Sequence, residues 1–406
     1  MLLESTQQSS RELRSVSDKL QHPLIYLIAG EPSGDQIGSR LMVALRKEMG
    51  GAVRFSGIGG PAMVSQGIKS LINFQELGLI GILEILPKAF QILRHVRTTV
   101  ADIERSQPRV LVTIDSWGFT GRIHRALANK ESPIKRMRYV APQVWAWRPG
   151  RAKELASWID HLLTLLPFEP PLFERHGLAV TWVGHPTLES GANLGDGGAF
   201  RQTYGLDEEA PIISLLPGSR RSEVQRLLPI FKATAKLLTK SIKNLCVVIP
   251  TTDTVSDLVR GQLVDWPSQV VMVCGNDARN NAFAASKAAL AASGSVTIEL
   301  AMAGVPHVIA YRVNPLSALI FKSLARTRYV NLINVLLQEH CIPEMLQSNC
   351  CAETLAKEVE ALMEDVGVRR AQLAGFKRAL GQLAPSGALP SDLAARAVID
   401  LMNVGT

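Results

Sequence analysis

Short apolar runs alternate along the chain with longer segments whose apolar residues recur at helical spacing. In the first half, these runs predict strands at residues 24–29, 53–56, 110–114, 137–141 and 180–183. In the second half, they predict strands at residues 212–216, 245–249, 270–273, 288–292 and 307–311. Strands that alternate with helices typically form parallel sheets covered by helices. The pattern therefore predicts an α/β fold.

The length of the chain and the breaks in this pattern indicate two domains, because 406 residues exceed what one hydrophobic core usually organises. We expect a disordered polar extension at 1–22, a first domain at 23–188, a linker at 189–205, a second domain at 206–350 and C-terminal helices at 351–406. Residues 1–22 lack the apolar core of a secretory signal, and no run of eighteen uncharged apolar residues occurs. No membrane-spanning helix is expected.

The five cysteines include no CxxC pair and no nearby group of histidines. This spacing argues against a zinc site and against a disulfide framework. It favours a protein of the reducing cytosol.

Positive charge is concentrated in one region of the first domain. Residues 86–153 contain fourteen Lys or Arg and four Asp or Glu, whereas the whole chain has a net charge of +8. The adjoining segment 77–97 is largely apolar, and Glu84, Pro87 and Lys88 interrupt its apolar run. Apolar surface beside cationic surface suits an anionic membrane, although a core helix followed by solvated charge has the same pattern. No nucleic-acid recognition motif accompanies these charges, so nucleic acid is not an expected partner.

The segment 216–224 has the pattern of a phosphate site. A buried strand leads into a turn at Gly218 and Ser219, and a helix begins just after Arg220. Backbone N–H groups at a helix start and an arginine side chain are common ligands of phosphate oxygens. An ordinary capped corner between a strand and a helix is the alternative interpretation.

A second corner of this kind follows the strand 288–292. Its turn and first helical turn contain Ser293, Gly294, Ser295, Thr297 and Glu299. Together the two corners favour a nucleotide site, in which one helix start binds a diphosphate and the carboxylate accepts hydrogen bonds from ribose hydroxyls. Alternatively, the carboxylate of Glu299 stabilises only its own helix.

Gly57, Gly59 and Ala62 match the dinucleotide pattern GxGxxG/A. However, Pro61 interrupts the turn, and the pattern follows the second strand rather than the first. We therefore do not expect a nicotinamide site.

Several longer motifs accompany these corners. They are AGEPSGD (29–35), GIGGPAM (57–63), LVTID (111–115), YVAPQVWAWRPGR (139–151), LLPFEPPLFERHG (165–177), VGHP (183–186), LLPGSRRSE (215–223) and the segment 291–313. In this order and spacing the chain resembles the lipid-A-disaccharide synthase family over nearly its whole length beyond the first residues. The resemblance implies a GT-B glycosyltransferase, with two Rossmann-like domains whose parallel sheets face a central cleft.

The resemblance also implies the reaction. UDP-2,3-diacylglucosamine would donate its sugar, with inversion, to 2,3-diacylglucosamine 1-phosphate, which gives a β-1,6-linked disaccharide 1-phosphate and UDP. No cofactor or metal is expected, since the chain contains no DxD motif. The acylated substrates favour peripheral attachment of a cytoplasmic enzyme to the inner leaflet of the inner membrane. The family further suggests a homodimer in which the C-terminal segment exchanges between chains or crosses back to the first domain.

Asp115 is the expected catalytic base, because it ends a buried strand at the edge of the sheet where open α/β folds bind ligands. Capping of the next helix is its alternative role. Arg220 is expected to offset charge on the leaving UDP, with Ser219 and Glu299 as further donor-binding residues. Asn334 matches a family position near the nucleotide.

The remaining candidates lie in the first domain. Glu31, Ser33, Gly34 and Asp35 form the first strand-to-helix turn, where the amides of residues 33 and 34 are expected to bind an acceptor phosphate. A capped turn without substrate contact is the alternative. His185 either contacts the donor or caps the hinge. Trp145, Trp147 and Arg148 either line the acceptor pocket or pack beneath a loop.

Two segments differ from the usual family pattern. Residues 116–120 read SWGFT where the family usually has Ala-Pro-Asp-Phe-Asn, and residues 338–340 read QEH where it has Gly-Arg-Glu. Two other functions therefore stay open. One is a different UDP-GlcNAc-using GT-B enzyme, a peptidoglycan-type transferase or a 2-epimerase, and the other is a lipid-sugar binding protein without activity.

Overall fold

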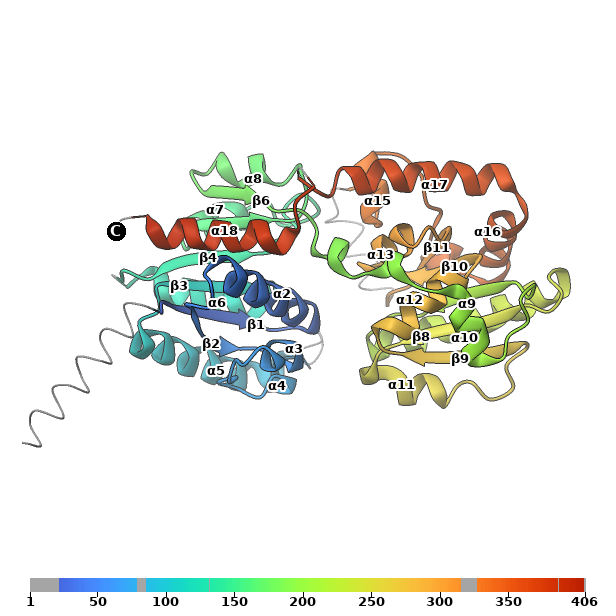
Figure 1. The fold of residues 1–406 in the computed structure, drawn as a ribbon, viewed down its shortest axis with the longest axis horizontal. Coiled ribbons are helices and arrows are strands. Elements are labelled where there is room, and N and C mark those ends of the chain that lie inside the picture. The colour runs from blue at the N-terminus through green and yellow to red at the C-terminus, as the bar shows by residue number, and fades with distance from the viewer. Residues whose placement is uncertain (1–21, 79–84, 131, 315–326, 386, 405–406) are drawn as a thin grey trace, which may run out of the picture. The chain divides into compact units, whose positions relative to one another are not determined.

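The computed structural model describes residues 22–78, 85–130, 132–314, 327–385 and 387–404. The chain divides into two compact units (Figure 1). The first comprises residues 1–186 and 384–406, and the second comprises residues 187–383.

The first unit is built on a six-stranded parallel sheet with the strand order β2-β1-β3-β4-β5-β6. The strands are β1 (Leu24–Ala29), β2 (Arg54–Ile58), β3 (Val110–Ile114), β4 (Lys135–Tyr139), β5 (His161–Thr164) and β6 (Ala179–Trp182). The central strands β1 and β3 are almost entirely buried, because helices cover both faces of the sheet. This burial explains why their sequences are continuous apolar runs rather than alternating ones.

Helices form a layer on each side of this sheet (Figure 1). They are α2 (Pro32–Glu48), α3 (Pro61–Ser65), α4 (Gln75–Gly78), α5 (Ile85–Ser106), α6 (Trp117–Ala128), α7 (Arg151–Ala156), α8 (Pro170–Glu174) and α18 (Pro390–Asn403). One core packs α2 and α18 against the strands, and another packs α5 and α6 against the strands. The first unit is therefore a three-layer sandwich.

The second unit repeats this plan with the strand order β12-β11-β10-β7-β8-β9, again all parallel. The strands are β7 (Ile212–Leu216), β8 (Cys246–Thr251), β9 (Gln269–Cys274), β10 (Ala288–Ala292), β11 (His307–Tyr311) and β12 (Glu344–Leu346). The helices are α9 (Gly197–Tyr204), α10 (Arg221–Ser241), α11 (Asp253–Arg260), α12 (Asn276–Ala285), α13 (Val296–Met302), α15 (Leu332–Leu337), α16 (Ala352–Glu364) and α17 (Val366–Gly381). Short 3₁₀ helices span Pro186–Glu189, Ala192–Leu194 and Gln347–Asn349.

The segment 189–205 is not the linker that its Gly-rich sequence predicts. Residues 197–204 form α9, whose Phe200 is buried in the core beside β8 and α12. The side chain of Asp196 caps this helix by accepting a hydrogen bond from Ala199 N. The segment therefore belongs to the second unit.

The C-terminal helices belong to different units. Helices α16 and α17 belong to the second unit, whereas α18 packs against α2 of the first (Figure 1). Ala394 and Val398 of α18 are fully buried there, and Lys47 forms an ion pair with Asp392 at 3.2 Å. Burial of the apolar face of α18, rather than this exposed pair, holds the end of the chain on the first unit.

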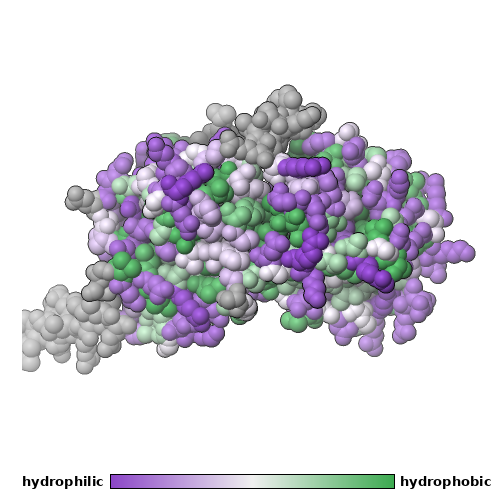
Figure 2. Space-filling view, turned by 90° about the horizontal axis from the view of Figure 1, so that it is seen from above, coloured by the Kyte–Doolittle hydropathy of each residue, from purple (hydrophilic) through white to green (hydrophobic). Residues whose placement is uncertain are grey.

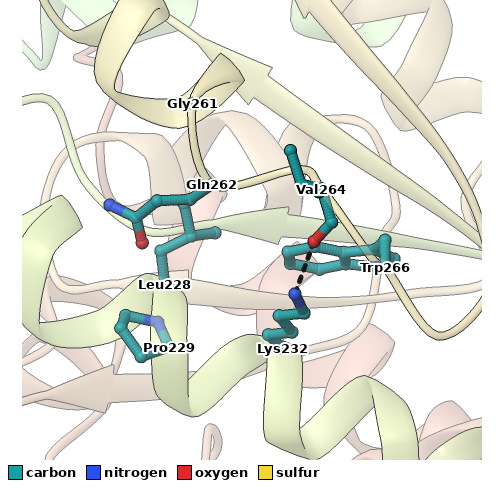
Figure 3. Close-up of a pocket in the computed structure, with 7 residues that line it drawn as sticks. All are labelled: Leu228, Pro229, Lys232, Gly261, Gln262, Val264 and Trp266. Carbon is teal, nitrogen blue, oxygen red and sulfur yellow. Dashed lines mark hydrogen bonds between the residues drawn. The ribbon is translucent and has the colours of Figure 1, made fainter.

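A shallow pocket of about 300 Å³ lies on the second unit between α10 and the turn before β9. Figure 3 shows Lys232 of α10 donating a hydrogen bond to the carbonyl of Val264 beside the ring of Trp266, with an Nζ to O distance of 2.6 Å. Because this turn precedes β9, the pocket lies toward the amino ends of the strands. Ligand sites of open α/β sheets lie at the carboxyl ends, so this pocket is not the candidate active site.

The surface in Figure 2 carries small groups of hydrophobic residues among hydrophilic ones. None of the described helices combines the length and the apolar character needed to cross a membrane. Phe90 of α5 is nevertheless 78% exposed, which is unusual for a phenylalanine.

Candidate active site

The turns that follow β1 and β3 lie against each other at the carboxyl edge of the first sheet. Ala29 and Ile114 are paired in register at the ends of these strands. A Cβ atom on Gly30 would lie 2.5 Å from Ser116 Oγ, so only glycine allows the two turns to approach this closely. Glu31 and Asp115 are thus brought to the same edge of the sheet.

Asp115 lies in a tightly held turn. Asp115 and Ser116 both have left-handed backbones, with φ of 51° and 50°, and such a pair is uncommon for residues other than glycine. The Asp115 amide donates to Tyr139 O at 3.0 Å, and its carbonyl accepts from Thr120 Oγ1 at 2.7 Å. The half-buried side chain of Asp115 therefore projects from a fixed backbone, as a catalytic group requires.

Arg138 is buried beneath this turn, and the sequence did not single it out. It is 1% exposed and donates from Nε to Val140 O and from Nη1 to Thr120 Oγ1, at 3.0 and 2.7 Å. Burial lowers the pKa of Arg138 to about 10, and the negative charge of Asp115 opposes this shift. A positively charged guanidinium therefore lies beneath the Asp115 turn.

The first strand-to-helix turn divides into exposed and buried residues. Ser33 is exposed, but Gly34 is buried, and a Cβ atom on it would lie 3.3 Å from Ile114 O. Asp35 is only 3% exposed, and its carboxylate accepts hydrogen bonds from the amides of Gly60, Ala62 and Met63 at 2.8 to 3.0 Å. The carboxylate of Asp35 therefore caps α3, whereas its predicted contact with substrate stays a prediction.

Replacing Asp35 with Ala is expected to destabilise the first unit by about 2–4 kcal/mol, because three buried amides lose a charged acceptor. Urea unfolding followed by circular dichroism measures this loss. As a control, Asp196→Ala removes an exposed helix cap with one hydrogen bond and is expected to cost about 1 kcal/mol. Equal effects of the two changes would contradict a capping role for Asp35.

The carboxylate of Glu169 organises the loop that contains Trp145. Glu169 is 3% exposed and accepts hydrogen bonds from the amides of Leu165 and Leu166 and from Trp145 Nε1 at 3.0 to 3.3 Å. Burial raises the pKa of Glu169 to about 7, and these hydrogen bonds oppose the shift. Trp145 also packs edge-on against Phe168, so this indole is part of the loop's own support.

The raised pKa of Glu169 makes stability depend on pH. The folded state keeps the proton up to about pH 7, whereas an unfolded glutamate loses it near 4.5, so stability falls as pH rises between these values. We expect the wild type to lose about 3 kcal/mol more than Glu169→Gln from pH 4.5 to 7. Urea unfolding at a series of pH values tests this, and parallel pH profiles for the two proteins would refute it.

His185 is 7% exposed, and burial lowers its pKa to about 4. It is therefore a neutral side chain at neutral pH. Its burial favours the hinge role over direct contact with the donor. The carbonyl of the next residue, Pro186, accepts a hydrogen bond from Arg40 Nη1 at 2.7 Å.

In the second unit, the carboxyl ends of β7 and β10 are adjacent, with Leu216 and Ala291 in register. Gly218 has a φ of 108°, and a Cβ atom on it would lie 2.4 Å from Glu223 Oε2. That oxygen accepts hydrogen bonds from the amides of Ser219 and Arg220 at 3.1 and 3.3 Å. The prediction that this turn leaves both amides open to an anion is wrong, because Glu223 already binds them.

Arg220 keeps most of its side chain accessible. Its Nη1 lies 3.4 Å from Glu223 Oε1, and the side chain is 70% exposed. A guanidinium has five N–H donors in a planar fork, so one such side chain can bind more than one oxyanion. Glu223 was not predicted as a site residue, although its position three residues after the cap is a recognised helix-start pattern.

The turn after β10 also differs in part from its prediction. Ser293 is half-buried, and Gly294 and Ser295 are exposed. Thr297 is fully buried and donates to Gly294 O at 2.8 Å, so it supports the turn, and its predicted contact with substrate stays a prediction. Glu299 forms an ion pair with Arg279 of α12 at 3.1 Å. Arg279 is a further residue that the sequence did not indicate.

Asn334 is fully buried within the second unit. Its Nδ2 donates to Ile342 O and Glu344 Oε1 at 2.8 and 2.9 Å, and its Oδ1 accepts from Ile342 N. Glu344 in turn accepts from the amides of Val330 and Asn331. Asn334 therefore fixes the connection before β12, and its contact with the nucleotide stays a prediction.

Comparison with known proteins points to a single enzyme family. A family model described as Lipid-A-disaccharide synthetase matches residues 25–383. A protein from Paramagnetospirillum magneticum named Lipid-A-disaccharide synthase is 48% identical over 385 residues, which cover 94% of this chain and 98% of that protein. The chain belongs to the lipid-A-disaccharide synthase family. It is therefore a glycosyltransferase of lipid A disaccharide synthesis.

Solved structures confirm the fold class that was predicted for this family member. A UDP-GlcNAc 2-epimerase from Neisseria meningitidis, bound to UDP-GlcNAc, matches with a TM-score of 0.59 and 11% identity over 93% of this chain and 98% of that one. The calicheamicin glycosyltransferase CalG4 matches with a TM-score of 0.57 and 14% identity over 95% of this chain and all of that one. At these identities the matches show the shared GT-B fold alone.

The candidate residues of this synthase lie at the carboxyl edges of the two sheets. Asp115, Glu31 and Ser33 lie at the carboxyl edge of the first sheet, and Arg220 and Glu299 lie at that of the second. Within the described ranges, no group of three or more His, Cys, Asp or Glu is arranged to hold a metal ion.

Proposed function

We propose that this chain transfers 2,3-diacylglucosamine from UDP to the 6-hydroxyl of 2,3-diacylglucosamine 1-phosphate. Membership of the family supports the reaction class, and the residues at the two sheet edges support the assignment of substrates to units. The first unit binds the acceptor, because it contains the fixed carboxylate of Asp115. The second unit binds the donor through the exposed Arg220 and the turn after β10.

The proposed step is a single in-line displacement. The acceptor 6-oxygen attacks the anomeric carbon of the donor while the carboxylate of Asp115 accepts the hydroxyl proton. The bond from the anomeric carbon to the diphosphate oxygen breaks, and its electron pair leaves with UDP. Arg220 binds the diphosphate as this charge develops. The displacement inverts the anomeric centre, which gives a β linkage.

The observation that carries this proposal is the Asp115 turn. Two consecutive left-handed residues, hydrogen bonds to the Asp115 amide and carbonyl and a buried guanidinium beneath all fix the backbone that carries this carboxylate. A simple helix cap needs none of this support, and the N-cap residue of α6 is Ser116 rather than Asp115. The structure of the turn therefore favours a chemical role.

Donor selectivity tests the proposed function against its nearest alternative. The purified protein is incubated with the acylated acceptor and either UDP-2,3-diacylglucosamine or UDP-GlcNAc, and products are identified by mass spectrometry. We expect disaccharide only from the diacylated donor. Turnover of UDP-GlcNAc to its 2-epimer, or its transfer to the acceptor, would replace the proposal with another UDP-GlcNAc-using enzyme.

Helix α5 supports the further proposal that the protein attaches to an anionic membrane surface on the cytoplasmic side of the inner membrane. Phe90 is 78% and Leu93 47% exposed, and Arg94 and Arg97 are exposed beside them at helical spacing. The opposite side of α5 packs Ile92 and Val96 into the core. Residues 79–84 of the predicted membrane segment lie outside the described residues.

Reversing charge on this face, with Arg94→Glu and Arg97→Glu, is expected to weaken binding to phosphatidylglycerol vesicles about tenfold or more. Vesicle flotation measures the effect. Lys236→Glu with Lys240→Glu makes the same charge change on α10 and is expected to leave binding nearly unchanged. Equal losses of vesicle binding in both variants would show that only net charge matters, and would contradict a specific membrane-binding face on α5. The homodimer stays a prediction.

A further inference from the structure

Arginine and tryptophan side chains form a layered group beside the Asp115 turn. The Arg151 guanidinium lies over the rings of both Trp117 and Trp147, 4.8 and 4.9 Å from their centroids. Arg148 lies over Trp147 at 4.8 Å, and the buried Arg138 lies over Trp117 at 5.3 Å. We call these five residues the arginine–tryptophan cluster.

The cluster contains two arginines whose charges are not paired. In the described part of the chain, neither Arg148 nor Arg151 forms an ion pair or a side-chain hydrogen bond, whereas Arg138 is satisfied by Val140 O and Thr120 Oγ1. Glu154 influences Arg151 electrostatically without forming an ion pair with it. Stacking on an indole fixes a guanidinium plane and leaves its N–H edge available, which is the geometry that binds phosphate oxygens.

The cluster lies next to the proposed base. Trp117 follows Asp115 by two residues, and Arg148 and Arg151 follow β4, the neighbour of β3 in the sheet. Tyr139 at the end of β4 accepts the hydrogen bond from the Asp115 amide. The loops that carry the base and the two arginines therefore start from adjacent strand ends.

We propose that Arg148 and Arg151 bind the anomeric phosphate of the acceptor sugar and select a phosphomonoester over an uncharged acceptor. This assignment rests on the proposed function and names the residues that recognise one of its substrates. In the acceptor, the phosphate on C1 and the reacting hydroxyl on C6 belong to one sugar ring, so the phosphate site must lie near the base. Arg151 lies over Trp117, two residues after Asp115, which places the cluster beside that base.

The first turn of α2, the position expected from the sequence, is less suitable for this phosphate. Pro32 at the start of the helix has no N–H group to donate. Glu31 and Asp35 place two carboxylates in the same turn, and negative charge there opposes the binding of a phosphate. The arginine–tryptophan cluster offers two cations instead.

Steady-state kinetics of the full chain with phosphorylated and dephosphorylated acceptor test the assignment. For Arg148→Ala and Arg151→Ala we expect KM for the phosphorylated acceptor to rise about tenfold to a hundredfold, with KM for the donor unchanged. The preference of the wild type for the phosphorylated acceptor should fall by the same factor. Lys153→Ala, an exposed charge deletion on α7, is the matched control and should change neither value.

A binding experiment separates this assignment from the proposed function. Glucosamine 1-phosphate is titrated into the wild type and the double variant while tryptophan fluorescence is recorded, since Trp117 and Trp147 are part of the site. Saturable binding to the wild type that the variant loses supports the assignment even if no disaccharide forms. Equal binding by both proteins, no binding by the wild type, or an equal loss of activity toward both acceptors would overturn it. Disaccharide formation by the wild type tests the proposed function separately.

Discussion

Asp115→Asn is expected to lower kcat about a thousandfold, the size of effect that general bases typically contribute. Asparagine has nearly the same shape and tolerates the left-handed backbone at this position, so the turn and its hydrogen bonds should persist. The variant keeps the second unit intact and should bind UDP with unchanged affinity. Initial rates and a UDP titration by calorimetry measure the two quantities.

Glu174→Gln is the control for this change, because Glu174 is an exposed carboxylate on α8 of the same unit. It should have wild-type activity. An Asp115→Asn enzyme that retains more than about a tenth of the wild-type kcat would exclude Asp115 as the base. If UDP affinity falls together with kcat, the substitution has disturbed the second unit as well as the first.

Arg220→Ala is expected to lower kcat/KM about a hundredfold to a thousandfold, because it removes a charged donor from the leaving diphosphate. UDP binding should weaken as well, since UDP retains both phosphates. Arg220→Lys should recover only part of the loss, because an ammonium does not reproduce the forked guanidinium. Initial rates at varied donor concentration and a UDP titration test these expectations.

Arg221 offers a matched control one residue away. It is an exposed arginine at the first position of α10, so Arg221→Ala makes the same change in charge. Its activity should stay close to that of the wild type. Similar losses in Arg220→Ala and Arg221→Ala would indicate a general electrostatic effect rather than direct binding of the diphosphate.

The sequence predicts the fold well because buried parallel strands are continuous apolar runs. The expected strand 110–114 coincides with β3, and 212–216 and 288–292 coincide with β7 and β10. Strands β5 and β12 were not predicted, and both are short, with four and three residues. The expected strand 137–141 begins two residues late, because β4 starts with the charged pair Lys135 and Arg136.

The sequence also places the candidate residues at strand ends, but it does not show which side chains the fold itself uses. Asp35 binds amides 25 to 28 residues further along the chain, and Asn334 binds Ile342 across a loop. Such partners depend on tertiary structure. Both residues carry the polar groups of a binding site, so the motif alone does not separate a supporting role from substrate contact.

Arg138, Arg279 and Trp117 were not predicted to matter, because nothing in the sequence around them indicates a role in the site. Arg138 lies in a strongly basic region, where a further charge suggests a solvated surface rather than a buried one. Arg279 precedes Glu299 by twenty residues, with no local pattern that links them. Trp117 stands where the family usually has proline, two residues after Asp115. Only the structure shows that two arginines stack on it.

The proposed transfer is tested most directly by measuring UDP and disaccharide together, with purified protein, both acylated sugars and mass spectrometry of the products. We expect one UDP for each disaccharide 1-phosphate from the wild type, and no UDP when either sugar is omitted. Asp115→Asn should give almost none of either product. Release of UDP without acceptor, or disaccharide formation by Asp115→Asn at the wild-type rate, would contradict the proposed transfer.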